Sequence, residues 1–84
     1  MKVNINKNLS FNVIFRPEPE GGFTAVAPSL PGCISFGKTL PMAKKMIMDA
    51  ISGYLISMKK RGEEMPLGDK ETFVSVVDFS SMHA

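Results

Sequence analysis

A single long amphipathic segment constrains the fold of this chain more than any other feature. Between positions 40 and 58, apolar residues recur at the i, i+3, i+4 and i+7 spacing of one helix face. The stripe consists of Leu40, Ala43, Ile47, Ala50, Ile51, Tyr54, Leu55 and Met58. Thr39 is a suitable N-cap, Pro41 is tolerated in a first turn, and Gly62 follows three basic residues as a helix stop. The pattern predicts one helix over Leu40–Arg61 with one apolar face to cover.

The segments on either side of this helix alternate with the period of two that is typical of strands. Four strands are predicted, at Leu9–Arg16, Phe23–Ala27, Cys33–Phe36 and Thr72–Phe79. The Pro/Gly-rich turn at 17–22 favours a hairpin between the first two strands, and Ser80–Ala84 is expected to fray. The expected fold is therefore α+β, in the order β-β-β-α-β. Antiparallel hairpin strands would carry one helix on one face, in a single domain over residues 1–84.

Length and composition exclude several classes of protein. A chain of 84 residues with 44% hydrophobic residues is too apolar for a disordered tail and too short for a multidomain enzyme. One cysteine excludes an internal disulfide framework and a Cys-rich zinc site, and the one histidine, His83, is the second-last residue. We expect no catalytic residues, no metal site, no cofactor and no enzymatic activity. Cys33 is expected to be a reduced, structural thiol.

The carboxylates form no convincing acid–base pair. Glu18 and Glu20 lie in the predicted turn, and Glu63 and Glu64 lie in the loop after the helix. Acid–base catalysis requires carboxylates held in a cleft with separated pKa values. Solvated loop acids are the better interpretation.

Charge is unevenly distributed along a chain whose formal net charge is +2. Residues 40–62 hold five basic residues and one acidic residue, whereas residues 63–84 hold five acidic residues and one basic residue. Candidate nucleic-acid contacts are the helix lysines Lys44, Lys45, Lys59 and Lys60. Recognition helices usually add Arg, Asn or Gln to contact base edges, and this segment has only Arg61 at its end. A solvated lysine face is favoured, so direct nucleic-acid binding is not expected.

Polar residues interrupt the N-terminal segment, so no signal peptide is expected, and no stretch approaches the length of a membrane span. A cytoplasmic protein without a membrane partner is the prediction.

Ile14 and Val26 would face away from the helix, and Met42 and Ile56 would lie off its core stripe. These residues are either scattered surface hydrophobes or a self-association surface. Because so small a domain gains from covering a second face, we expect a homodimer or higher oligomer.

The middle of the chain carries a recognisable motif. Its positions are Gly21, Gly22, Phe23, Pro28, Leu30, Pro31, Gly32, Cys33, Gly37 and Thr39. This run resembles the "GGY/F…A…P-x-LPGC…G-x-T" pattern of the HicB antitoxin family. The regularly placed Ala43 and Ala50, and the run Gly62-Glu63-Glu64-Met65-Pro66, are similar to that family's helix and to its "GE-x-x-P" loop. The resemblance covers residues 9–66.

The resemblance implies a fold, a function and a partner. The fold would be partial RNase H-like, without the nuclease carboxylates. The function would be to neutralise HicA, a small basic ribonuclease toxin, by blocking its active site. Full-length members usually add a C-terminal DNA-binding module, and because the chain ends at Ala84 we expect no operator repression by it.

The sequence departs from the family pattern at Lys44 and Lys45, which stand where acids are usual and would repel a basic toxin. Toxin contacts are therefore expected at the acidic residues Glu18, Glu20, Glu63, Glu64, Asp69 and Glu71. Two alternatives remain open at this point. The chain could be a solitary HicB-like oligomer, or a nucleic-acid-binding module that uses the lysine face.

Overall fold

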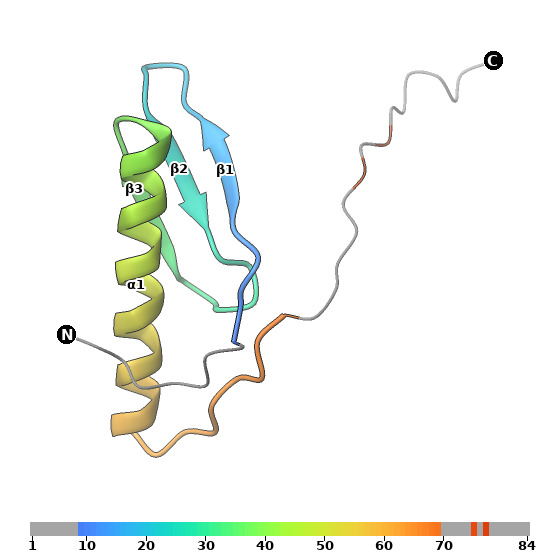
Figure 1. Cartoon of the computed structure of the whole chain (residues 1–84), viewed down its shortest axis with the longest axis vertical. Helices are drawn as coiled ribbons and strands as arrows, with labels where there is room; N and C mark the ends of the chain where they lie inside the picture. The colour runs from blue at the N-terminus through green and yellow to red at the C-terminus, as the bar shows by residue number, and fades with distance from the viewer. Residues whose placement is uncertain (1–8, 70–74, 76, 78–84) are drawn as a thin grey trace.

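The computed structural model describes residues 9–69, 75 and 77. Its elements are β1 (Ile14–Pro17), β2 (Phe23–Val26), β3 (Ile34–Gly37) and α1 (Leu40–Lys60). The strands form an antiparallel sheet in the order β1-β2-β3, and α1 lies along one face of it (Figure 1). The predicted α+β class and the predicted hairpin are confirmed, and the arrangement agrees with a partial RNase H-like fold. The predicted strand Thr72–Phe79 and tail Ser80–Ala84 lie outside the described residues, apart from residues 75 and 77.

The first strand is shorter than the alternation predicted. β1 begins at Ile14 instead of Leu9, and Pro17 is its last residue instead of part of the turn. β2 is only four residues long, so among the described residues no strand lies beside residues 9–13 to form a ladder with them. The alternation nevertheless predicted the two faces correctly, because Phe11, Val13 and Phe15 pack against the core and Ile14 is exposed.

The strand register sorts the sheet residues into two faces. Ile14 pairs with Val26, and Val26 pairs with Ile34, so these three form one row across the sheet. The row Arg16, Thr24 and Phe36 lies on the same side, because residues two apart in a strand share a face. The other side carries Phe15, Ala25 and Ser35, and there Ala25 is fully buried. Helix α1 covers this second side and leaves the first open.

Helix α1 begins at Leu40 as predicted and ends at Lys60, one residue before the predicted end, with Arg61 as its C-cap. The Thr39 side chain accepts a hydrogen bond from the Met42 main-chain N–H at 3.3 Å, and Pro41 lies in the first turn. At the other end, the N–H groups of Gly62 and Glu63 donate to the carbonyls of Lys59 and Met58, at 3.1 and 3.0 Å. This is the Schellman pattern of a glycine-terminated helix.

The core is small. Its fully buried members are Ala25, Ala27, Leu30, Cys33, Ala43, Ile47 and Leu55. Leu40 was predicted to belong to the core stripe, but its side chain is 46% exposed. Leu40 lies in the first turn of α1, just after the end of β3, and it is not among the half-buried residues that pack against the core.

Candidate partner-binding surface

The motif residues hold the fold together. Pro28 and Pro31 flank a tight connection in which the Ala27 N–H donates to the Cys33 carbonyl at 3.0 Å. Within that connection, Leu30 donates to Ala27 and Cys33 donates to Leu30, at 3.0 and 2.9 Å. The Leu30 side chain is buried beneath the turn. This segment therefore joins β2 to β3 and adds to the core, and it presents no reactive group.

At two motif positions, only glycine leaves room for the neighbouring parts of the chain to pack closely. A Cβ at Gly37 would lie 2.7 Å from the Met42 carbonyl carbon and closer still to the Ala43 main chain, where α1 crosses the end of β3. Gly22 has a φ of +83°, and a Cβ there would overlap the Phe36 ring. Glycine at these positions lets the helix and the hairpin turn sit directly against β3.

Cys33 is a buried, free thiol. Burial raises its pKa above the ordinary value, which disfavours the reactive thiolate. The buried position of Cys33 agrees with the predicted structural role.

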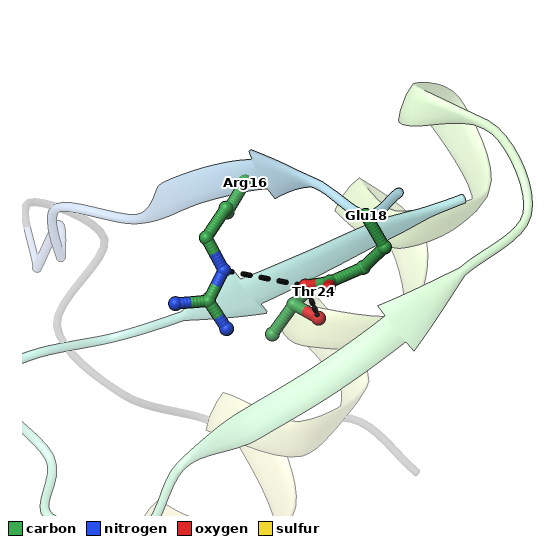
Figure 2. Close-up of polar contacts among 3 residues, drawn as sticks. All are labelled: Arg16, Glu18 and Thr24. Carbon is green, nitrogen blue, oxygen red and sulfur yellow. Dashed lines mark hydrogen bonds and ion pairs between the residues drawn. The ribbon is translucent and has the colours of Figure 1, made fainter. Parts of the chain in front are cut away.

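Glu18 is held by the hairpin itself (Figure 2). One of its carboxylate oxygens accepts hydrogen bonds from the Thr24 hydroxyl at 2.6 Å and from the Arg16 Nε–H at 3.3 Å. The Thr24 bond, followed by the Arg16 bond, lowers the pKa of Glu18 below its ordinary value. Glu18 is thus half-buried and paired, whereas Glu20 at the tip is exposed. Of these two acids, Glu20 is the one available to a partner.

The segment after α1 also has one acid that is paired within the chain and one that is exposed. Arg61 forms an ion pair with Glu63 through a short contact between Nε and Oε2, and this hydrogen bond lowers the pKa of Glu63. Glu64 is exposed, and among residues 9–69 it enters neither of the two ion pairs. Glu64 is therefore the available acid at this end of the molecule.

Asp69 fastens the post-helix segment to the start of the fold. Its carboxylate accepts hydrogen bonds from the Asn12 main-chain N–H at 2.6 Å and from the Ser29 hydroxyl. Its own main-chain N–H donates to the Ser10 carbonyl at 2.7 Å. The Ser29 and Asn12 bonds lower the pKa of Asp69. These contacts give Asp69 a structural role beside the residues that precede β1.

The predicted acidic residues do not form one patch. Figure 1 shows the β1–β2 turn, with Glu18 and Glu20, at the end of the molecule where α1 begins. The segment with Glu63 and Glu64 lies at the end where α1 finishes. Glu71 lies outside the described residues.

The four helix lysines are all exposed, but they form two pairs. Lys44 and Lys45 are near the start of α1, and Lys59 and Lys60 are in its last turn. Fifteen residues of helix separate the pairs, which corresponds to about 22 Å along the axis. The structure therefore gives each end of α1 a mixture of basic and acidic groups.

In the part of the chain that the structure describes, no group of three or more His, Cys, Asp or Glu residues could hold a metal ion. Within the same part, no helix has the length and apolar character needed to cross a bilayer.

Sequence reasoning missed the apolar surface around β3. Ile34 is 59% exposed and Phe36 is 50% exposed on the open face of the sheet. Met46, on the neighbouring flank of α1, is 48% exposed. The alternation of Cys33 and Ser35 with Ile34 and Phe36 could have placed the last two outward. Only the structure shows that β3 is an edge strand with the methionine beside it.

Comparison with known proteins decides the family. A family model described as a HicB-like antitoxin of a bacterial toxin–antitoxin system matches residues 11–81. This chain belongs to the HicB-like antitoxin family. A UPF0150 protein of Thermoplasma acidophilum is 35% identical over 63 residues, which cover 75% of this chain and 91% of that protein. A UPF0150 protein of Synechocystis is 32% identical over 69 residues, which cover 82% of this chain and 87% of the relative.

Proposed function

We propose that this HicB-like chain is an antitoxin that neutralises a small, basic ribonuclease of the HicA type by occluding its active site. The observation that carries the proposal is the family match over residues 11–81, across a fold whose motif residues serve structure. Such a protein would act by binding in the cytoplasm and would perform no chemistry of its own.

Two exposed acids are the contacts that this proposal favours. Glu20 and Glu64 stay outside both ion pairs of the described residues, so their charges can pair with cations of a basic partner. Glu18, Glu63 and Asp69 already accept hydrogen bonds within the chain, and we assign them the task of shaping the two acidic ends. Because the ends lie apart, a single small toxin would contact one of them, and the lysine pair nearby would limit the orientations it can take.

The test starts with a pull-down of the full-length tagged chain from its host, at low and at high salt. Recovery of a small basic protein in stoichiometric amount, with loss of that protein's RNA cleavage on addition of the chain, is the expected result. Recovery of nucleic acid alone, lost at high salt, would favour the lysine face instead. In that case Lys44→Glu with Lys45→Glu should abolish the nucleic-acid binding.

Charge reversal at each end then locates the contact. We expect either Glu20→Lys or Glu64→Lys to weaken toxin binding by at least about tenfold, the effect of losing about 1.4 kcal/mol of charge pairing. The variant at the other end is the matched control and should bind as the parent does. Unchanged binding by both variants would remove the acidic ends from the contact.

A further inference from the structure

A shallow pocket of about 320 Å³ lies between the start of β3 and the second half of α1. Cys33, Ile34 and Ala50 form its apolar part. Gly53 leaves the helix wall of the pocket open, because a Cβ there would meet nothing within 4 Å. A volume of this size is at the lower end of the range for small-molecule sites, so the pocket fits a ligand larger than a single ion.

Hydrogen-bond donors line the other part of this pocket. Tyr54 and Ser57 of α1 and its C-cap Arg61 all border the pocket. In the part of the chain that the structure describes, the Tyr54 and Ser57 hydroxyls take part in no hydrogen bond. The pKa of Arg61 is raised chiefly by Glu63 and to a smaller extent by Tyr54, so the Tyr54 phenol lies within electrostatic reach of the guanidinium. One guanidinium and two hydroxyls therefore face the same space.

The guanidinium of Arg61 is held by an ion pair that a ligand can replace. Its Nε–H donates to Glu63, and the two side chains are 56% and 46% exposed. Ion pairs between exposed side chains contribute little to stability, so giving this one up costs little. Within the described residues the contact uses only the Nε–H, which leaves the terminal NH₂ groups of the guanidinium for another acceptor.

We propose that this pocket binds a small nucleotide, a nucleoside monophosphate. The Arg61 guanidinium and the Tyr54 and Ser57 hydroxyls would donate to the phosphate oxygens, and the phosphate would take the place of Glu63 on Arg61. A phosphate monoester carries more charge than a carboxylate and has three strong acceptor oxygens, so it suits three donors better than Glu63 does. The nucleoside would rest on the apolar part of the pocket. The inference goes beyond the antitoxin proposal and does not depend on it.

Charge favours an anionic ligand at this position. Lys59, Lys60 and Arg61 are consecutive at the end of α1, and all three are exposed. They outnumber the two acids that follow, Glu63 and Glu64, and Glu63 is the group that the ligand would displace. A cationic side chain of a protein partner would meet the Arg61 guanidinium in the pocket and be repelled. A free nucleotide is favoured over an RNA strand, because the lysines that a strand would follow form two pairs at opposite ends of α1.

NMR titration of the ¹⁵N-labelled full chain with AMP tests the proposal. The main-chain amides of Gly32, Gly53 and Ser57 should shift and saturate with a Kd below about 1 mM, and the Lys44 amide should not shift. Adenosine and inorganic phosphate each offer one part of the ligand, and each should bind at least about tenfold more weakly than AMP. Arg61→Gln should weaken AMP binding by at least about tenfold, because it removes the charged donor.

The two glutamates after α1 provide a matched pair of variants. Glu63→Gln removes the carboxylate that competes for Arg61 and should tighten AMP binding by about two- to fivefold. Glu64→Gln removes the same charge from a residue outside both ion pairs of the described chain, so its effect should be smaller. Equal effects of the two variants would show that AMP does not displace Glu63, which would overturn the proposed contact with Arg61.

Several results with the parent chain would overturn the proposal without any question about the folding of variants. One is the absence of saturable shifts at about 10 mM AMP, and another is a shift at the Lys44 amide as large as those at the pocket. Equal binding of adenosine and AMP would exclude a phosphate site, and equal binding of inorganic phosphate and AMP would exclude a nucleoside site. A 5′-hydroxyl RNA oligonucleotide that bound more tightly than AMP would make an RNA strand the ligand instead.

Discussion

The two edge strands of this sheet, β1 and β3, differ in the side chains that surround them. On the β1 side, Arg16 and Thr24 both donate hydrogen bonds to Glu18, and Asp69 accepts a hydrogen bond from the Asn12 N–H just before the strand. The β3 edge is apolar, carries the helix closely against it and exposes Ile34 and Phe36. The comparison teaches that the two sides of one short sheet can differ, because polar contacts tie down the β1 side whereas the β3 side exposes apolar side chains.

The largest expected effect is on stability, and it should differ between substitutions at the last residues of the two edge strands. Pro17 and Gly37 pair with Phe23 from opposite sides. Gly37→Val would drive a side chain into the main chain of α1, and we expect a loss of about 3 kcal/mol or more in the free energy of unfolding. Pro17 is exposed, so Pro17→Val should change stability by less than about 1 kcal/mol. Urea unfolding measures both, and equal losses would show that the helix does not rest on β3 as described.

A smaller effect is expected on the helix flank beside β3. Gly53 borders a shallow pocket of about 320 Å³, together with Cys33, Ile34 and Ala50. A Cβ at Gly53 would meet nothing within 4 Å. Gly53→Ala should therefore stabilise the protein by about 1 kcal/mol, the difference in helix propensity.

Ser57→Ala on the same pocket wall is the matched control for Gly53→Ala. It should gain no more than about 0.5 kcal/mol in urea unfolding. A destabilising Gly53→Ala would mean that the flank is packed more tightly than the structure shows.

The smallest effect belongs to the β1 side and depends on pH. Thr24→Val removes the hydroxyl that donates to Glu18, and it should lower the Tm at pH 7 by roughly a few degrees. The folded pKa of Glu18 lies below its ordinary value of 4.5. The stabilisation is therefore present above pH 4.5 and is lost as the pH falls through the folded pKa.

Thermal melts at pH 7 and pH 3 check the Thr24→Val prediction. Thr24→Ser, which keeps the hydroxyl, should retain the parental Tm at both values. A deficit for Thr24→Val as large at pH 3 as at pH 7 would show that the hydrogen bond to the carboxylate is not its cause.

Much of the fold could be predicted because it depends on local patterns. The helix ends follow from Thr39 and Gly62, and the hairpin follows from the Pro/Gly turn between two alternating segments. The length of β1 could not be predicted from its own residues, because a ladder also needs a partner strand, and β2 is short. The exposure of Leu40 likewise could not be predicted from its place in the apolar stripe, because it depends on what packs beside the first turn of the helix.

The candidate contacts were harder to predict than the fold. A list of acids along the chain does not show which carboxylates are already paired. Glu18 and Glu63 are held by Arg16 and Arg61, whereas Glu20 and Glu64 remain available. That distinction rests on side-chain geometry at each end of the molecule.

The sequence by itself determined the element types, the helix caps, the structural role of the motif and the family, because each follows from residues close together in the chain. Within the described residues, the tertiary structure alone decided which strands form the edges of the sheet, which acids lie outside the ion pairs and which apolar residues flank β3. Those properties depend on which segments become neighbours when the chain folds. The alternation in Ile34–Gly37 indicates two faces, but only the β1-β2-β3 order makes that strand an edge.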